Sequence, residues 1–148
     1  TIGTLDGANV EMHQQLGDEN IFLFGLTAQQ VAQTKANGYA PLDIYSHDPG
    51  LKQVIDQLSD GFDDGVPYAD LTRRLLFGAG GAPADEYLLL ADFDSYRQAH
   101  CRALEVYADP ARWNRMSLMN IARSGIFAAD RSIRDYAENI WHVPVREE

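Results

Sequence analysis

The glycine-rich run Gly78-Ala79-Gly80-Gly81 is the first candidate for chemistry, because glycine-rich loops cradle phosphate groups in many enzymes. Such loops lie between a strand and the N-terminus of a helix, where backbone N–H groups and the helix dipole meet the anion. Here a helical pattern precedes the run and a strand-like pattern follows it, and no Lys-Ser or Lys-Thr pair comes next. This order favours a plain linker over a phosphate loop.

Closely spaced carboxylates form the second candidate. Asp92 and Asp94 are separated by one residue after an apolar run, and two such carboxylates could ligate Mg²⁺. Either could instead cap the helix predicted to follow, and this interpretation is favoured. A further acidic cluster comprises Asp60, Asp63 and Asp64. It lacks the longer ligand set and the closing glutamate of a calcium loop, so we expect a solvated loop here.

The histidines are too far apart in sequence to form a metal-ligand pair such as His-x-x-x-His. We expect each to lie on the surface or to pack on a helix; they are His13, His47, His100 and His142. Cys101 is the single cysteine, so no intrachain disulfide can form, and a reducing compartment is expected. Cys101 is predicted to be an inert core residue.

Asp6, Asn9 and Glu11 lie where a predicted strand ends and a helix begins, which is the place where α/β sheets bind ligands. Asp6 or Asn9 could form the floor of an active site. The alternative is a cap and a turn beside such a site, and this alternative is favoured. We therefore assign no catalytic, cofactor-binding or metal-binding residue.

The elements that would position these residues follow from hydrophobic spacing. Apolar runs predict three short strands, at 1–5, 20–24 and 86–91. Helical spacing predicts helices at 8–16, 28–36, 51–58, 68–77, 95–107, 110–123 and 130–141. The sequence predicts irregular structure at 39–49 and a flexible link at 78–84. Leu71, Leu75 and Leu76 are expected to face inward.

Helix ends are predicted from capping residues. Gly17 and the pair Asn37-Gly38 should end the first two helices. The expected N-terminal caps are Asp6, Thr27, Asp92 or Asp94, Asp109 before Pro110, and Asp130 or Ser132.

These elements predict an α/β fold: the C-terminal part of a Rossmann-like parallel sheet domain, rich in helices, with about three short strands and a helical tail. We expect β-α units with inserted helices over 1–91 and the helical tail over 92–148. The chain begins inside an apparent core strand without an initiator methionine, so we expect a piece of a longer protein whose N-terminal domain is absent.

Composition excludes several classes of partner. The net charge is −10, which argues against nucleic acid and anionic membrane surfaces because both require clustered Lys and Arg. No run of 18 or more apolar residues is present, and the chain has no signal-peptide pattern. A cytoplasmic location is expected.

The first twelve residues read Thr1-Ile-Gly-Thr-Leu-Asp-Gly-Ala-Asn-Val-Glu-Met12. This stretch resembles the segment that follows the pyridoxal-phosphate lysine of the glycogen/maltodextrin (α-glucan) phosphorylases. Further blocks keep the family's order: Glu19–Gly25, Gln57–Phe62, Trp113–Met116, Asn120–Gly125, Asp130–Ile133, Tyr136-Ala137 and Ile140-Trp141. The segment 66–86 departs from the family pattern.

The resemblance implies a glycosyltransferase-B fold and an enzyme that uses inorganic phosphate to release glucose 1-phosphate from α-1,4-glucans. It also implies an allosteric enzyme family, a homodimeric parent and a pyridoxal phosphate cofactor whose 5′-phosphate takes part in proton transfer. The family's attachment lysine, phosphate-binding residues and sugar-binding glutamate would lie upstream of Thr1. We therefore expect the piece alone to be inactive and to bind no cofactor.

Two alternatives remain open: a fragment of a sugar-nucleotide glycosyltransferase of the same architecture, and a non-catalytic α/β binding module. The preferred glucan is also open. An aromatic and apolar set at helical spacing could be core or, by the resemblance, a contact with the rest of a phosphorylase chain. Exposure of this set in a detached piece would favour self-association; it comprises Trp113, Arg115, Met116, Asn120, Ile121, Tyr136, Ile140 and Trp141.

Overall fold

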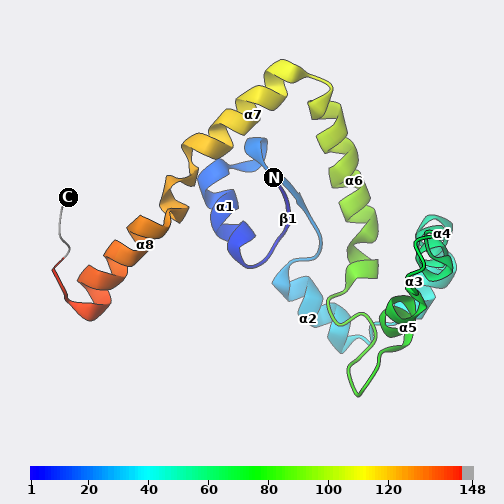
Figure 1. Ribbon diagram of the computed structural model, residues 1–148. Helices are drawn as coiled ribbons and strands as arrows, with labels where there is room; N and C mark the ends of the chain where they lie inside the picture. Colours follow the sequence, from blue (N-terminus) through cyan, green and yellow to red (C-terminus); the bar gives the residue numbers. More distant parts are fainter. Residues whose placement is uncertain (145–148) are drawn as a thin grey trace.

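A computed structural model of the chain describes residues 1–144 and shows a helix-rich α/β protein with one small parallel sheet (Figure 1). Strand β1 (Ile2–Thr4) pairs with β2 (Phe22–Phe24), and Ile2 lies opposite Phe22. Between the strands the chain forms helix α1 (Ala8–Leu16) and the short 3-10 helix η1 (Asp18–Asn20). The first two predicted strands and their crossover helix are confirmed.

The predicted third strand at 86–91 is wrong. The chain turns at Leu88, whose φ is 58°, and helix α6 (Leu89–Tyr107) starts at the next residue. Leu88 and Leu90 are buried, so the apolar run is the buried first turn of a helix. A short apolar run does not distinguish a buried strand from a buried helical turn, which explains the error.

The remaining helices follow the prediction closely except at one place. The chain forms α2 (Ala28–Ala36), α3 (Pro41–His47), α4 (Pro49–Asp60), α5 (Ala69–Phe77), α7 (Pro110–Ala122), η2 (Ser124–Phe127), α8 (Ala129–Tyr136) and the π-helical turn η3 (Ala137–Trp141). The prediction that 39–49 is irregular is wrong. Pro41 and Pro49 each occupy the first turn of a helix, where proline's missing N–H costs nothing.

Four of the predicted helix ends are confirmed. Gly17 and Asn37 occupy the C-cap positions of α1 and α2. Thr27 forms a full capping box with Gln30, and Asp109 accepts hydrogen bonds from two N–H groups of α7.

The other predicted caps are wrong. At α1 the N-cap is Gly7, and at α8 it is Ala128, so neither Asp6 nor the pair Asp130 and Ser132 caps a helix. Asp92 and Asp94 lie inside α6.

Within residues 1–144, two separate hydrophobic clusters form the core. The first joins β2 to α6 and α7 through Phe22, Ala99, Val106 and Met116, with Trp113 packed against it. The second joins α3, α4, α5 and the start of α6, and contains Leu51, Ile55, Leu90, Leu75 and Leu76. The prediction that Leu71 faces inward is wrong, since it is exposed while Thr72 is buried.

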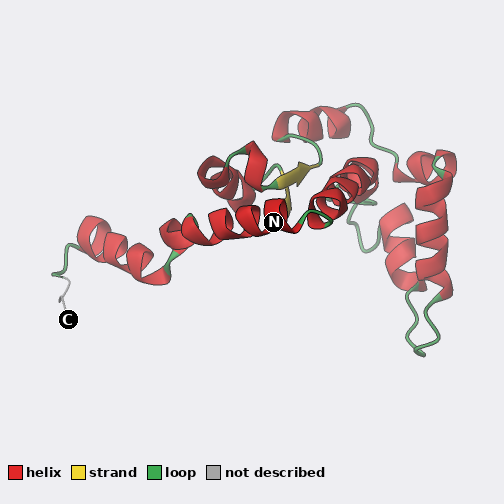
Figure 2. Cartoon of the chain, turned by 90° about the horizontal axis from the view of Figure 1, so that it is seen from above, coloured by secondary structure: helices red, strands yellow, loops and turns green. Residues whose placement is uncertain are grey.

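The molecule is open in shape. Helices α3, α4 and α5 lie together at one end, and α8 projects at the other end beyond the sheet (Figures 1 and 2). Among the described residues, α8 makes its main contacts only with its chain neighbours η2 and η3. Within residues 1–144 no helix is long and apolar enough to cross a membrane.

Candidate functional site

The carboxyl edge of the two-stranded sheet is hollowed by a cavity of about 380 Å³. In parallel α/β sheets this edge is where ligands bind, so it is the first place to look for a site. The lining combines aromatic side chains with two carboxylates and comes from both strands, α2 and α6: Thr4, Asp6, Phe24, Leu26, Val31, Tyr87, Leu89, Asp92, Phe93 and Tyr96.

Asp92 is held against the loop that follows β2. Its Oδ1 accepts a hydrogen bond of 2.9 Å from the Leu26 N–H, and one helical turn on, Ser95 Oγ accepts one of 2.9 Å from the Gly25 N–H. A Cβ at position 25 would lie 2.8 Å from Asp92 Oδ2, and Gly25 has a φ of 89°. Only glycine fits here without strain. Asp92 therefore ties α6 to the end of β2.

Asp6 and Asn9 take part in a small network at the end of β1. The Thr4 hydroxyl donates to Asp6 Oδ1 at 2.5 Å, and Asn9 Nδ2 donates to Thr4 Oγ1 at 3.2 Å. Asn9 packs on Gly3, where an added Cβ would lie 2.8 Å from its side chain. Glu11 is exposed on α1 and does not line the cavity. The geometry agrees with a structural role for Asn9, while Asp6 reaches the cavity.

The structure brings Asp6 and Asp92 to one cavity, although they are 86 positions apart in sequence. Burial raises the pKa of Asp92, and the negative charges of Asp85 and Asp6 raise it further. The lining contains no Lys, Arg or His. This edge therefore offers hydrogen-bond acceptors and aromatic surface, but no cation that could hold a phosphate group.

Asp85 is the residue that sequence reasoning missed. Its side chain is 5% exposed and accepts hydrogen bonds from the Leu89 and Leu90 N–H groups, both at 2.8 Å, and from the Tyr39 hydroxyl at 2.6 Å. Burial and this hydrogen bond raise the pKa of Tyr39 well above its usual range. The available signal was an aspartate two residues before the apolar run 87–90, because aspartate is favoured just before a helix, where its carboxylate accepts hydrogen bonds from free backbone N–H groups.

Two of the other acidic candidates, Asp94 and Asp64, bind neighbours on their own segments. Asp94 is paired with Arg97 at 2.7 Å and accepts from Gln98, so it points away from Asp92's partners. Asp64 accepts from the Tyr68 hydroxyl and the Val66 N–H, and these contacts lower the pKa of Asp64. In the described part of the chain, no three His, Cys, Asp or Glu side chains are grouped so that they could hold a metal ion.

The glycine run 78–81 forms a compact turn between α5 and α6. An antiparallel bridge joins Ala79 to Ala82, and a Cβ on Gly78 would lie 2.4 Å from the Ala82 carbonyl oxygen. The segment therefore links α5 to α6 by a turn whose tip, Gly80 and Gly81, is exposed.

The histidines lie as predicted, on the surface or against a helix. His13 Nε2 lies 2.5 Å from Asp18 Oδ1, and His100 stacks on Tyr96. The other two, His47 and His142, bond carbonyl oxygens four residues earlier on their own helices. The prediction for Cys101 is wrong, because its side chain is exposed on α6. The apolar face of α6 is carried instead by its neighbours in the helix, Ala99 and Val106.

The residues of this chain do not fit the attachment of pyridoxal phosphate. Attachment requires a lysine in a pocket, and the chain has only two lysines. Lys35 is exposed on α2, and Lys52 is engaged by Asp56 at 2.8 Å on α4. Neither lines the cavity at the sheet edge.

Comparison with known proteins gives a consistent result. A sequence model of the carbohydrate phosphorylase family matches residues 1–143. Glycogen phosphorylase of Synechocystis sp. is 45% identical over 143 residues, the enzyme of Chlamydia pneumoniae 40% over 149, and the human liver form 40% over 146. These alignments cover 97–99% of this chain and 16–17% of the relatives. The chain therefore belongs to the carbohydrate phosphorylase family.

Proposed function

We propose that this chain is part of an α-glucan phosphorylase, which cleaves terminal α-1,4-glucosyl units with inorganic phosphate to give glucose 1-phosphate. The observation that carries the proposal is the family match along residues 1–143, together with glycogen phosphorylases at 40–45% identity over nearly the whole chain. This match favours a phosphorylase over a sugar-nucleotide glycosyltransferase and over a binding module of another family.

The chain's role in that enzyme is to support the catalytic groups, because its sheet edge carries carboxylates and no phosphate-binding cation. The catalytic residues and the pyridoxal phosphate lysine would come from the remainder of the enzyme. We therefore propose that the chain alone is inactive and holds no cofactor. A cytoplasmic location, a homodimeric parent and glucan and phosphate as partners belong to the same proposal.

The hydrogen bonds of the sheet favour a larger, Rossmann-like sheet of the glycosyltransferase-B type. The outer edge of β2 is covered by side chains, since Leu23 O accepts from Arg102 and the Gly25 N–H donates to Ser95. The Phe22 N–H bonds Thr1 O, so Thr1 and Gly3 face β2 while Ile2 and Thr4 direct their backbone groups the other way. An added strand would therefore pair with β1. The division into β-α units over 1–91 and a helical tail over 92–148 belongs to this proposed domain.

The exposed surface also supports a larger assembly. The chain exposes 10,814 Å², whereas a compact protein of 16.5 kDa exposes roughly 7,500 Å². Part of this surface is apolar and lies on α7, α8 and η3, where the following side chains are about half exposed or more: Leu118, Ile121, Ile133, Tyr136, Ile140 and Trp141. A surface of this kind favours packing against further protein, and self-association when that protein is missing.

A chimera tests the proposal. The segment of Synechocystis glycogen phosphorylase that aligns with this chain would be replaced by residues 1–143, and glucose 1-phosphate release from glycogen and phosphate would be measured. The matched controls are the unchanged enzyme, the enzyme lacking that segment, and residues 1–148 alone. We expect activity from the chimera and none from the deletion or from the isolated chain.

Two outcomes would overturn the proposal. One is a chimera that is folded, dimeric and loaded with cofactor but releases no glucose 1-phosphate. The other is glucan extension from a sugar nucleotide by a protein carrying this chain, which would favour the alternative glycosyltransferase.

A further inference from the structure

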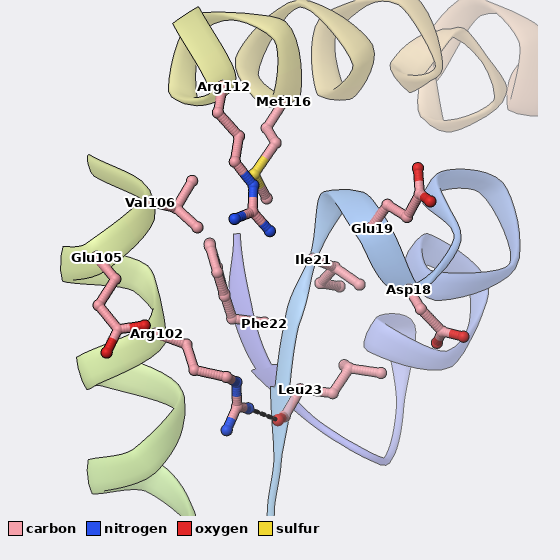
Figure 3. A pocket seen from close by; sticks show the side chains of 10 residues that line it. All are labelled: Asp18, Glu19, Ile21, Phe22, Leu23, Arg102, Glu105, Val106, Arg112 and Met116. Atoms are coloured by element: carbon pink, nitrogen blue, oxygen red, sulfur yellow. Dashed lines mark hydrogen bonds between the residues drawn. The ribbon is translucent and has the colours of Figure 1, made fainter. Parts of the chain in front are cut away.

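A second cavity, of about 360 Å³, lies against the outer edge of β2 between α6 and α7 (Figure 3). It shares no residue with the cavity at the carboxyl edge of the sheet. Its lining combines two arginines, three carboxylates and an apolar group: Arg102, Arg112, Asp18, Glu19, Glu105, Ile21, Phe22, Leu23, Val106 and Met116.

The two arginines converge on the cavity from different helices. Figure 3 shows Arg102 of α6 and Arg112 of α7 both reaching toward β2. Arg102 donates to Leu23 O at 3.2 Å, which leaves its other N–H groups free. Within residues 1–144 the Arg112 guanidinium takes part in no hydrogen bond and neither arginine is ion-paired.

Arg102 and Arg112 bring two cationic side chains to one cavity in a chain whose net charge is −10. Elsewhere in residues 1–144, Arg73, Arg97 and Arg131 each bind an aspartate three or four positions away on their own helix, while Arg74, Arg115 and Arg134 are in no ion pair either. What distinguishes this cavity is that two guanidinium groups from different helices meet there, because arginine's fork of N–H donors matches phosphate and carboxylate oxygens.

The backbone of β2 adds a further donor on the same side. Phe22 uses its N–H toward β1, so the next residue, Leu23, directs both its N–H and its C=O to the outer edge. The carbonyl is taken by Arg102. The Leu23 N–H faces the cavity, and an anion bound between the two arginines could accept a hydrogen bond from it.

The floor and the rim limit the kind of anion. Phe22, Val106 and Met116 are each more than 90% buried and give the cavity an apolar floor. Glu19 and Glu105 at the rim repel further negative charge, while Asp18 is already engaged by His13. The volume is at the lower end of the range for small-ligand pockets.

We propose that this cavity binds a phosphomonoester that carries a ring or another apolar body. The phosphate would lie between Arg102, Arg112 and the Leu23 N–H, and the body would pack on Phe22 and Met116. The rim carboxylates would disfavour ligands with more than one anionic group. The site is separate from the sheet edge, and it does not depend on which reaction the parent enzyme catalyses.

The test uses the full chain and three probes measured by isothermal titration calorimetry at low salt. Phenyl phosphate has both the anion and the ring, inorganic phosphate has only the anion, and benzyl alcohol has only the ring. We expect phenyl phosphate to bind more tightly than either partial probe, with an affinity that falls as salt is added.

Substitutions then locate the site. Arg112→Gln should weaken phenyl phosphate binding by about tenfold or more, since one set of charge-assisted hydrogen bonds is lost. Arg112→Lys should bind with intermediate affinity, because the charge remains and the fork is lost. Arg115→Gln is the matched control, as Arg115 lies exposed on the same helix and does not line the cavity. The Arg112 side chain is exposed and makes no hydrogen bond or ion pair within residues 1–144, so its variants should melt like the wild type.

Three results would overturn the proposal. Phenyl phosphate could fail to bind, it could bind Arg112→Gln as tightly as the wild type, or Arg115→Gln could weaken binding as much as Arg112→Gln. The last result would show general attraction to surface charge and no site.

Discussion

The buried carboxylate of Asp85 accepts three hydrogen bonds from two parts of the chain and gives the sharpest expectation for stability. It caps the start of α6 through the Leu89 and Leu90 N–H groups and binds the Tyr39 hydroxyl in the segment between α2 and α3. Asp85→Ala would remove both acceptor oxygens, and with them all three hydrogen bonds, and would leave buried donors unsatisfied. A hydrogen bond to a charged group contributes about 1.5–3 kcal/mol, and the three are not additive.

We therefore expect Asp85→Ala to lower the free energy of unfolding by about 3–5 kcal/mol, which corresponds to roughly 10–15 °C in Tm for a chain of this size. Asp85→Asn keeps one acceptor and should cost less. The assay is urea and thermal unfolding followed by circular dichroism at 222 nm, with wild type and variants at equal concentration because self-association would shift the midpoint.

Asp94→Ala is the matched control. Asp94 lies on the same helix, is exposed and pairs only with its neighbours Arg97 and Gln98, so its removal should leave the midpoint nearly unchanged. If Asp85→Ala unfolds within 1 °C of Asp94→Ala, Asp85 does not hold the start of α6, and the reasoning is refuted.

Three further expectations concern single side chains. Asp92→Asn should raise the unfolding midpoint at pH 7. The raised pKa of Asp92 means that the folded state disfavours the charged carboxylate, so the wild type loses stability as the pH rises through that pKa. At pH 3 the carboxyl group is neutral in both states, and the variant should no longer be more stable than the wild type. A variant less stable than the wild type at pH 7 would show that the charge itself is needed. Thr27→Ala should lower the free energy of unfolding by about 1 kcal/mol through loss of the capping box, measured by urea unfolding, while Thr27→Ser should recover most of it; equal stability of Thr27→Ala and wild type would contradict the cap. Cys101 is exposed and should react with a chromogenic disulfide reagent as fast in native buffer as in denaturant, whereas strong protection in the native state would place it in a buried contact.

Much of the secondary structure could be predicted from the sequence because local signals agreed with the fold. Thr27 with Gln30, Asp109 before Pro110 and Gly17 after α1 mark helix ends by mechanisms that depend only on neighbouring residues. The early strand–helix–strand unit was predicted for the same reason, since its apolar runs are bounded by turn residues.

The errors arose where a distant contact decides the outcome. Leu88–Leu90 became a helical start because Asp85 caps it and the second core cluster buries it. Neither fact is visible in a window of local residues. Similarly, Cys101 and Leu71 have apolar character, but other side chains of their helices occupy the faces that pack inward.

The candidate site shows the same limit. Asp6 and Asp92 were each noted in the sequence, but only the packing of α6 on β2 brings them to one cavity. The pairing of Arg102 with Leu23, on which the second cavity depends, joins residues 79 positions apart. The spacing of residues along the chain does not reveal which distant residues come into contact; the fold is needed for that.

We propose that this chain supports the active site of an α-glucan phosphorylase whose catalytic groups lie outside it. The most direct measurement is the sequence of the coding DNA immediately upstream of Thr1. We expect an in-frame segment that encodes Glu-Ala-Ser-Gly-Thr-Gly-Asn-Met-Lys or a close variant, the family's cofactor attachment site. An initiation codon directly before Thr1, with no such lysine, would contradict the claim and favour a free-standing, non-catalytic domain.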